Sequence, residues 1–341
     1  MGTVMRMNGK NTAAGRAALR KGSKKKTAVP AVRHLRYDVT NSETPGTETS
    51  YFIDVAKDLS ALNRRLYRQG RSYHIRKITV VSRDTLGGLY PGALPGTVSQ
   101  QNAGRISFST APNSWVARGA WKRGFKTYNL MNEEATHNLT NDISGKWSDF
   151  KIYLSNDHYA GTKLVPIDNG GNSPTGGEWT YSDFISPDGT TSSDSFRINL
   201  MGDTSGAAGS VVYVGLIKSF GDTRATVDYD QPNVPGDASD DPLLNVFDYG
   251  TTIDEVIDQL EQDNDNPPYD LDDYPGADSN MPKPLVMADV TVSDGSTTLG
   301  GFEALCGLIE VECNSPIAND VWSVLVEVAP GNYRGIKADV I

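Results

Sequence analysis

The segment Tyr73-His-Ile-Arg-Lys-Ile-Thr-Val-Val81 sets the expectation for the fold. Its apolar residues recur at near-alternate positions, which is the pattern of a β-strand with one buried face. The segment Arg105-Ile-Ser-Phe-Ser109 alternates polar and apolar residues with a period of two, and Tyr51-Phe-Ile-Asp-Val55 has a similar strand-like composition. These runs predict a protein built from short, half-buried strands.

Further strand-like runs follow along the chain, separated by polar loops. One of them, 210–220, is almost continuously apolar, which is typical of a central strand buried on both faces. The predicted runs are Phe150–Leu154, Glu178–Ile185, Ser195–Leu200, Ser210–Phe220, Leu285–Val292, Leu308–Val311 and Val321–Val328.

Helical patterns are few. Leu59, Leu62 and Leu66 lie on one face of a short predicted helix over residues 57–67. About ten short strands with one or two short helices predict an all-β protein, an antiparallel jelly-roll sandwich.

The segment 114–134 is ambiguous. Trp121, Phe125 and Tyr128 have helical spacing, but Gly119 and Gly124 disfavour a helix. Basic residues run beside these aromatic residues, which could stack on a single-stranded nucleic acid. We favour the alternative, in which the aromatic residues are core and the lysines extend to solvent.

The composition agrees with a strand-and-turn protein. The 341 residues include 34 glycines and 18 prolines, and no window reaches the ~18 apolar residues of a membrane span. We therefore expect no membrane partner. Cys306 and Cys313 lie in an apolar stretch and are expected to be two buried free thiols.

The chain carries its charge in two separate blocks. The first 37 residues contain ten Lys or Arg and no acidic residue, within a net charge of −10 for the whole chain. This composition predicts a disordered basic arm over residues 1–37, which would neutralise phosphates without sequence specificity. A solvated tail and a nuclear-import signal, which would place the protein in the host nucleus, are the alternatives. The arm cations are Arg6, Lys10, Arg16, Arg20, Lys21, Lys24, Lys25, Lys26, Arg33 and Arg36.

A second basic cluster, Arg64, Arg65, Arg68 and Arg71, surrounds the first predicted helix. It is either a nucleic-acid-facing surface or a solvated helix face opposite the leucines.

The second charged block is acidic. Residues 227–281 contain sixteen Asp or Glu and no basic residue. They are predicted to form a loop or projection of the domain 38–341, and Ca²⁺ is the only cofactor considered for them. An EF-hand is excluded, because Pro268 stands where the loop needs glycine and no Glu lies at the twelfth position. The weak Ca²⁺ candidates are Asp263, Asp265, Asp270, Asp272 and Asp273.

Catalytic and metal-binding signatures are absent from the sequence. The four histidines fit no metal-ligand spacing, and no nucleotide-binding loop or nucleophile motif is present. We therefore do not expect an enzyme.

Two regions resemble a known family. They are Ser50-Tyr-Phe-Ile-Asp-Val-Ala-Lys-Asp-Leu-Ser-Ala-Leu-Asn-Arg-Arg-Leu-Tyr-Arg-Gln-Gly70, and Pro112-Asn-Ser-Trp-Val-Ala-Arg-Gly-Ala-Trp-Lys-Arg-Gly-Phe-Lys126 together with Trp147-Ser-Asp-Phe-Lys151. Both resemble capsid proteins of small circular Rep-encoding single-stranded DNA viruses, including bacilladnavirus-like lineages. The resemblance covers roughly residues 50–155.

This resemblance implies a jelly-roll coat protein without catalytic residues. It would assemble into an icosahedral shell of on the order of 60–180 copies, with the basic arm on a packaged genome, expected to be single-stranded DNA. The protein would then be found in the virion. Small RNA-virus capsids share the architecture and stay an alternative. So do a lectin-like or adhesin-like binding module using Trp179, and a hydrolase using carboxylates of the acidic stretch.

Overall fold

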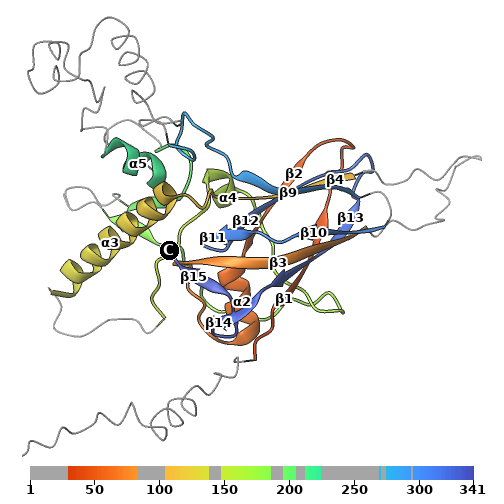
Figure 1. The fold of residues 1–341 in the computed structure, drawn as a ribbon, viewed down its shortest axis with the longest axis horizontal. Coiled ribbons are helices and arrows are strands. Elements are labelled where there is room, and N and C mark those ends of the chain that lie inside the picture. Colours follow the sequence, from red (N-terminus) through yellow and green to blue (C-terminus); the bar gives the residue numbers. More distant parts are fainter. Residues whose placement is uncertain are drawn as a thin grey trace, which may run out of the picture.

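A computed structural model describes residues 30–82, 104–137, 147–185, 195–204, 212–223, 269, 274–292 and 295–341. Antiparallel β-sheet dominates these residues, and helices are few (Figure 1). The expectation of a mainly β protein with antiparallel sheets is therefore confirmed.

The first sheet is organised around one long strand, β3. Its strands run in the order β1-β13-β3-β10, and β11 and β15 also pair with β3. The end of β3 near Ser82 lies between β13 and β10, whereas its beginning near Arg71 lies between β11 and β15. The strands are β1 (His34–Thr40), β3 (Arg71–Ser82), β10 (Ser296–Gly300), β11 (Glu303–Leu305), β13 (Val321–Val328) and β15 (Ala338–Val340).

The second sheet has five strands in the order β5-β2-β12-β4-β9. Every pair in it is antiparallel except β2 with the short β5. The strands are β2 (Thr49–Asp54), β4 (Gly104–Thr110), β5 (Thr162–Lys163), β9 (Leu285–Val292) and β12 (Leu308–Asn314).

Eight of these strands pair in a nested way. In chain order they are β1, β2, β3, β4, β9, β10, β12 and β13, and the first pairs with the eighth, the second with the seventh, the third with the sixth and the fourth with the fifth. The pairs β3–β13 and β4–β12 then join these ribbons into the two sheets.

One apolar core is shared by the two sheets. Tyr37 and Trp322 from the first sheet and Phe108 and Val311 from the second are fully buried in the same cluster. Residues of β13 alternate between partly exposed and buried from Val321 to Val326, as the period-two pattern predicts, and the last two residues of the strand are buried as well. Fully burying each large apolar side chain contributes about 1.5–3 kcal/mol.

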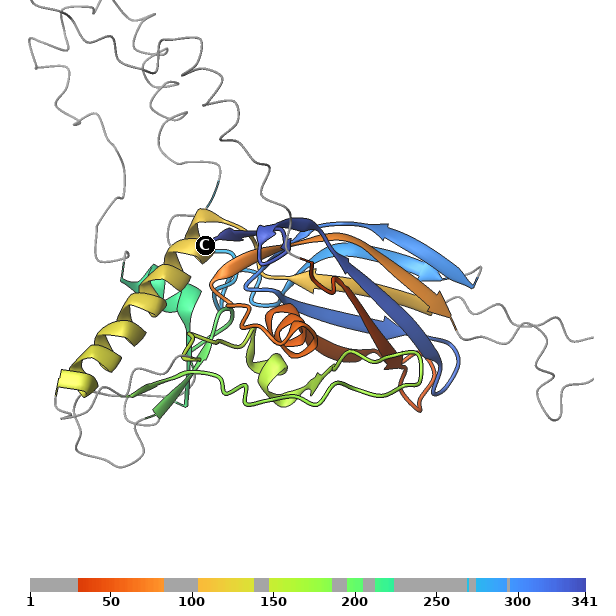
Figure 2. The same cartoon turned by 90° about the horizontal axis from the view of Figure 1, so that it is seen from below.

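A second core lies at one end of the sheets, where α3 and α5 lie together (Figure 2). The long helix α3 (Trp115–His137) packs beside α5 (Leu216–Asp222). A Cβ on Gly124 would lie 2.9 Å from Leu216, and one on Gly119 3.0 Å from Phe220. The two glycines that argued against a helix therefore permit the close packing of α5 on α3.

The remaining elements complete the described chain. A small sheet has the order β6-β7-β8, and β7 and β8 are parallel. The elements are β6 (Asp183–Ile185), β7 (Ser195–Asn199), β8 (Tyr213–Gly215), β14 (Pro330–Tyr333), α2 (Val55–Asn63) and α4 (Asn156–Ala160).

Two strand predictions are wrong. Within 212–220 only Tyr213–Gly215 is a strand, because Gly215 caps α5 and the following Leu216 and Ile217 turn into the second core. The prediction at 150–154 fails for another reason. It forms only a single bridge, in which Tyr153 pairs in parallel with Asn199 of β7. The N–H groups on either side bond to side chains instead, because Ile152 N–H donates to Gln69 Oε1 and Leu154 N–H to His158 Nδ1.

Three further elements differ from the prediction in length. The strand predicted at 178–185 is limited to β6, and α3 has 23 residues, whereas only short helices were predicted. The predicted arm extends too far, because His34–Tyr37 already belong to β1. Leu35, Tyr37 and Val39 point into the core, but the surrounding basic residues hide this alternation in the sequence.

The two cysteines are free and buried, as expected. Among the described residues, no helix combines the length and apolar character that a membrane crossing requires.

Candidate nucleic-acid interface

A groove with a volume of about 950 Å³ lies between the ends of α2 and α3 and two connecting segments. We call it the basic groove. It is lined from 57–66, 128–132, 147–151 and 175–183, so it is assembled from four separated parts of the chain.

The basic side of the groove is formed by the end of α2. Asp54 caps the start of this helix by accepting from the Lys57 N–H at 3.1 Å, and Leu59 anchors its buried face. The helix ends at Arg64, whose backbone is left-handed with φ 52°. This turn places Arg64 and Arg65 at the exposed rim of the groove.

Aromatic side chains line the same groove. Trp147 is 65% exposed, and Trp179 and Tyr128 also line the groove. The Lys151 ammonium lies 4.9 Å from the centre of the Trp179 ring. Cations next to accessible aromatic faces are what a single-stranded nucleic acid needs, because phosphates meet charge while bases stack.

A buried carboxylate holds this wall in place. Asp54 accepts from Gln69 Nε2 at 2.8 Å, Trp179 Nε1 at 3.0 Å and the Tyr181 hydroxyl at 3.2 Å. Burial raises the pKa of Asp54 above its ordinary value, against the lowering effect of the Lys57 N–H, Gln69 and Trp179 hydrogen bonds. Gln69 extends this hydrogen-bond network to the segment 147–151 and its neighbour Ile152, because its Oε1 accepts from the Ile152 N–H. The network fixes the groove's aromatic segment to the start of α2.

The charge of the groove is mixed. Four basic residues line the groove, Lys57, Arg64, Arg65 and the buried Lys151, together with three acidic residues, which leaves a net charge of +1 (four minus three). The acidic residues are Asp149, Glu178 and Asp183. Asp149 is paired with Arg68 at 3.0 Å, outside the groove lining, which raises the local balance to +2. Because the groove alone is only weakly positive, it would act as an accessory to a stronger cationic element.

Such an element begins at the rim of the groove. Asn63 exchanges two hydrogen bonds with the backbone of Val32, at 2.7 and 3.0 Å, and Arg65 donates to the Pro30 carbonyl at 3.4 Å. Residues 1–29, which carry eight of the predicted arm cations, therefore connect to the body beside Arg65.

The predicted nucleic-acid residues have different outcomes. Arg64 and Arg65 lie together in the groove, whereas Arg68 is engaged by Asp149 and the Ser148 carbonyl. Arg33 and Arg36 are not arm residues. Arg33 donates to the Val328 carbonyl at 3.4 Å. Arg36 lies in β1, where it pairs with Asp38 and donates to the Asp168 carbonyl and to Asn169 Oδ1.

The other predicted residues lie outside the described part of the chain. These are Arg6, Lys10, Arg16, Arg20, Lys21, Lys24, Lys25 and Lys26 of the arm, and the Ca²⁺ candidates Asp263, Asp265, Asp270, Asp272 and Asp273. The described end of the acidic stretch is folded: Tyr274 and Ala277 are buried in the second core, and Asp278 pairs with Lys218 at 2.8 Å.

The prediction that the aromatic stripe of α3 belongs to the core is confirmed in part. Trp121 is buried and Tyr128 packs against the second core, whereas Phe125 stacks on Trp121 but is 38% exposed. Lys122 and Lys126 extend to solvent, as expected. The C-terminal half of α3 still reaches the groove through Tyr128.

Comparison with known proteins finds no counterpart: the chain matches no protein-family model, no curated protein and no solved structure. The geometry and the sequence are therefore the only grounds for assigning a function.

Proposed function

We propose that this chain is a viral capsid protein that assembles into an icosahedral shell and packages a nucleic-acid genome, single-stranded DNA in the first instance. Its folded body would form the wall. Residues 1–29 would neutralise the genome, and the basic groove would hold a short length of strand where the arm meets the body.

The strand pairing supports a jelly roll for the wall. A jelly roll is a long antiparallel ribbon of eight strands rolled into two facing sheets. Rolling such a ribbon pairs strands first with eighth, second with seventh, third with sixth and fourth with fifth, and β1, β2, β3, β4, β9, β10, β12 and β13 pair in this way.

The observation that carries the packaging role is where the arm leaves the body. The Pro30 carbonyl accepts from Arg65, so the arm joins the body beside the groove cations. Eight arm cations in each of about 60–180 copies would supply roughly 500–1,400 positive charges, which at one charge per phosphate would neutralise about a sixth to a half of a single-stranded genome of about three kilobases.

Electron microscopy of the purified full-length protein tests the assembly. Uniform closed particles are expected, and a monomer that persists at high protein concentration and low salt would refute a shell. That monomer would instead favour the second candidate, a carbohydrate-binding module, because the groove combines the exposed Trp147 with carboxylates such as Glu178.

Two deletions test the arm. Removing residues 1–29 leaves β1 intact and should give particles that lack nucleic acid, measured by the ratio of absorbance at 260 and 280 nm. Removing residues 1–37 also deletes His34–Tyr37 of β1 and should prevent particle formation. Unchanged packaging by the shorter deletion would refute the role of the arm.

A further inference from the structure

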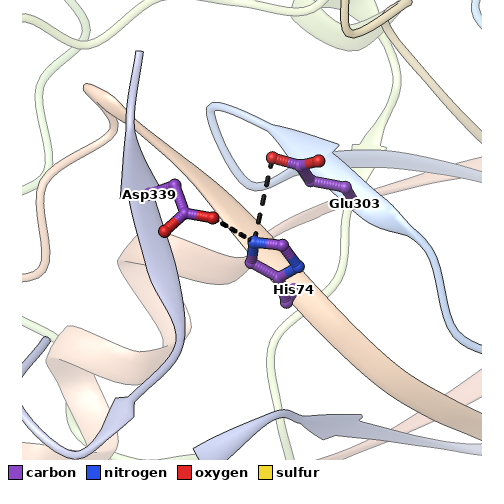
Figure 3. A group of neighbouring side chains, drawn as sticks. All are labelled: His74, Glu303 and Asp339. Carbon is purple, nitrogen blue, oxygen red and sulfur yellow. Dashed lines mark hydrogen bonds and ion pairs between the residues drawn. The ribbon is translucent and has the colours of Figure 1, made fainter. Parts of the chain in front are cut away.

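A histidine and two carboxylates meet on the surface of the first sheet, away from the basic groove. His74 lies on β3, Glu303 on β11 and Asp339 on β15, and the three side chains point toward one another (Figure 3). The three residues are far apart in the sequence, so no sequence motif predicts that they lie together.

The strand register brings the three residues together. Glu303 pairs directly with His74 across β11 and β3, and Asp339 pairs with Ser72 across β15 and β3. Residues 72 and 74 share one face of β3, since side chains alternate along a strand. The backbone of His74 is itself held, because its N–H donates to Lys337 and its carbonyl accepts from Ala329.

The distances suit a metal ion with little rearrangement. His74 Nε2 lies 2.6 Å from Asp339 Oδ2 and 3.8 Å from Glu303 Oε1, and the three ligand atoms all lie within 4.8 Å of one another. Around a tetrahedral ion with bonds of about 2.1 Å, ligand atoms are about 3.4 Å apart. Changes in side-chain torsion would be enough to reach that spacing.

An outer contact orients one of the carboxylates. Arg118 Nη2 donates to Glu303 Oε1 at 3.4 Å, and Arg118 Nε donates to Asn113 Oδ1 at 2.6 Å. Hydrogen-bonded partners behind the ligating groups are usual at metal sites, where they hold the ligand in position. His74 and Glu303 are also partly shielded, with side chains 21% and 28% exposed.

We propose that His74, Glu303 and Asp339 bind a divalent transition-metal ion of the Zn²⁺ type. One imidazole nitrogen and two carboxylate oxygens fit Zn²⁺ better than Ca²⁺ or Mg²⁺, which prefer oxygen ligands alone. Three protein ligands leave a coordination position open for water or for a group from another molecule. The ion would tie the short strands β11 and β15 to β3.

Titration of the metal-free, untagged full-length protein with ZnCl₂ by calorimetry tests the proposal. One Zn²⁺ per chain should bind at this site, and an excess of Ca²⁺ should not displace it. The variants His74→Gln and Asp339→Asn should each lose at least about tenfold in affinity, because removing a ligand costs no less than removing an outer partner.

Asp289→Asn is the matched control. Asp289 is an exposed carboxylate paired with Arg105 on another strand, outside the group of potential ligands found among the described residues, so this variant makes the same charge change and should bind Zn²⁺ normally. Asp339 is 60% exposed, so its variant keeps the fold even if His74→Gln does not. Bound Co²⁺ should give a visible absorption band in the wild type that is lost in Asp339→Asn.

Two results would overturn the proposal. The first is no stoichiometric Zn²⁺ binding by the wild type, which would leave a His74–Asp339 ion pair as the whole interaction. The second is equal binding by the wild type and both variants, which would place the ion elsewhere, for example on the acidic stretch.

Discussion

Glu310 allows a quantitative test of the electrostatics of the second sheet. It lies on β12 between the core residues Ile309 and Val311, so its side chain points to the opposite face of the sheet, where it is nevertheless buried. Burial, followed by the nearby charges of Glu312 and Asp157, raises the pKa of Glu310 to about 7 from 4.5. Lys283, which is paired with Asp157, opposes this only in part.

The raised pKa makes stability depend on pH with a definite sign. Below pH 4.5 the carboxyl is protonated in both the folded and the unfolded chain, and its contribution is fully present. Between pH 4.5 and about 7 the unfolded chain releases the proton while the folded chain keeps it, so the free energy of unfolding falls. A pKa difference of about 2.5 corresponds to a total loss of about 3 kcal/mol above pH 7.

The variant Glu310→Gln keeps the shape of the side chain and removes the titration. From pH 5 to pH 8 its free energy of unfolding should therefore gain about 2.5 kcal/mol relative to the wild type. Urea unfolding followed by tryptophan fluorescence at these two pH values measures the gain. Two protein concentrations should give the same midpoint, so that association does not contribute.

Glu312→Gln is the control on the same strand face. It removes one of the charges that act on Glu310, so it should show less than half of that gain. A difference between Glu310→Gln and the wild type that stays constant within about 0.5 kcal/mol from pH 5 to pH 8 would refute the reasoning.

Three further predictions concern the groove and the backbone. Asp54→Asn turns an amide N–H₂ toward donors of the buried network and should cost about 3 kcal/mol in urea unfolding, whereas a loss under 1 kcal/mol would contradict that network. Gly301→Ala should destabilise the fold by more than 2 kcal/mol in the same assay, because its Cβ would lie 2.1 Å from the Ile75 carbonyl oxygen, while Gly300→Ala, with open space around it, should stay within about 0.5 kcal/mol. The double variant R64A/R65A should reduce the slope of log K against log salt concentration for single-stranded DNA, measured by fluorescence anisotropy, by about 1.4, and an unchanged slope would remove the groove from the interface.

Local patterns predicted the parts of the fold that depend on local rules. Arg105–Ser109 and Val321–Val328 were predicted as strands and lie within β4 and β13. Ile106 and Phe108 of the first and Trp322, Val324 and Val326 of the second lie at alternate positions in the core. The prediction failed where tertiary contacts override the pattern. Apolar residues after Gly215 pack as a helix because a second core is there to receive them, and Leu35 and Tyr37 form a strand although they lie among basic residues.

The candidate site was predictable only in its charged component. Arg64 and Arg65 are neighbours in the sequence, so their cluster was visible, and the structure places them in the groove. The aromatic wall and its buried support were not visible, because Asp54 and Trp179 meet only through the fold. The same holds for the metal-binding proposal, whose three residues come from three strands.

The nested pairing of strands has a consequence for synthesis of the chain on the ribosome. Even the innermost pair joins Thr110 to Leu285, and the outermost joins His34 to Glu327. While the nascent chain is shorter than about 285 residues, the early strands have none of these partners and present unpaired edges. Loop closure over such separations makes folding slow, on the scale of milliseconds to seconds. The sheets must therefore close late, after most of the polypeptide has left the ribosome, and until then the early strands depend on dilution or chaperones to avoid aggregation.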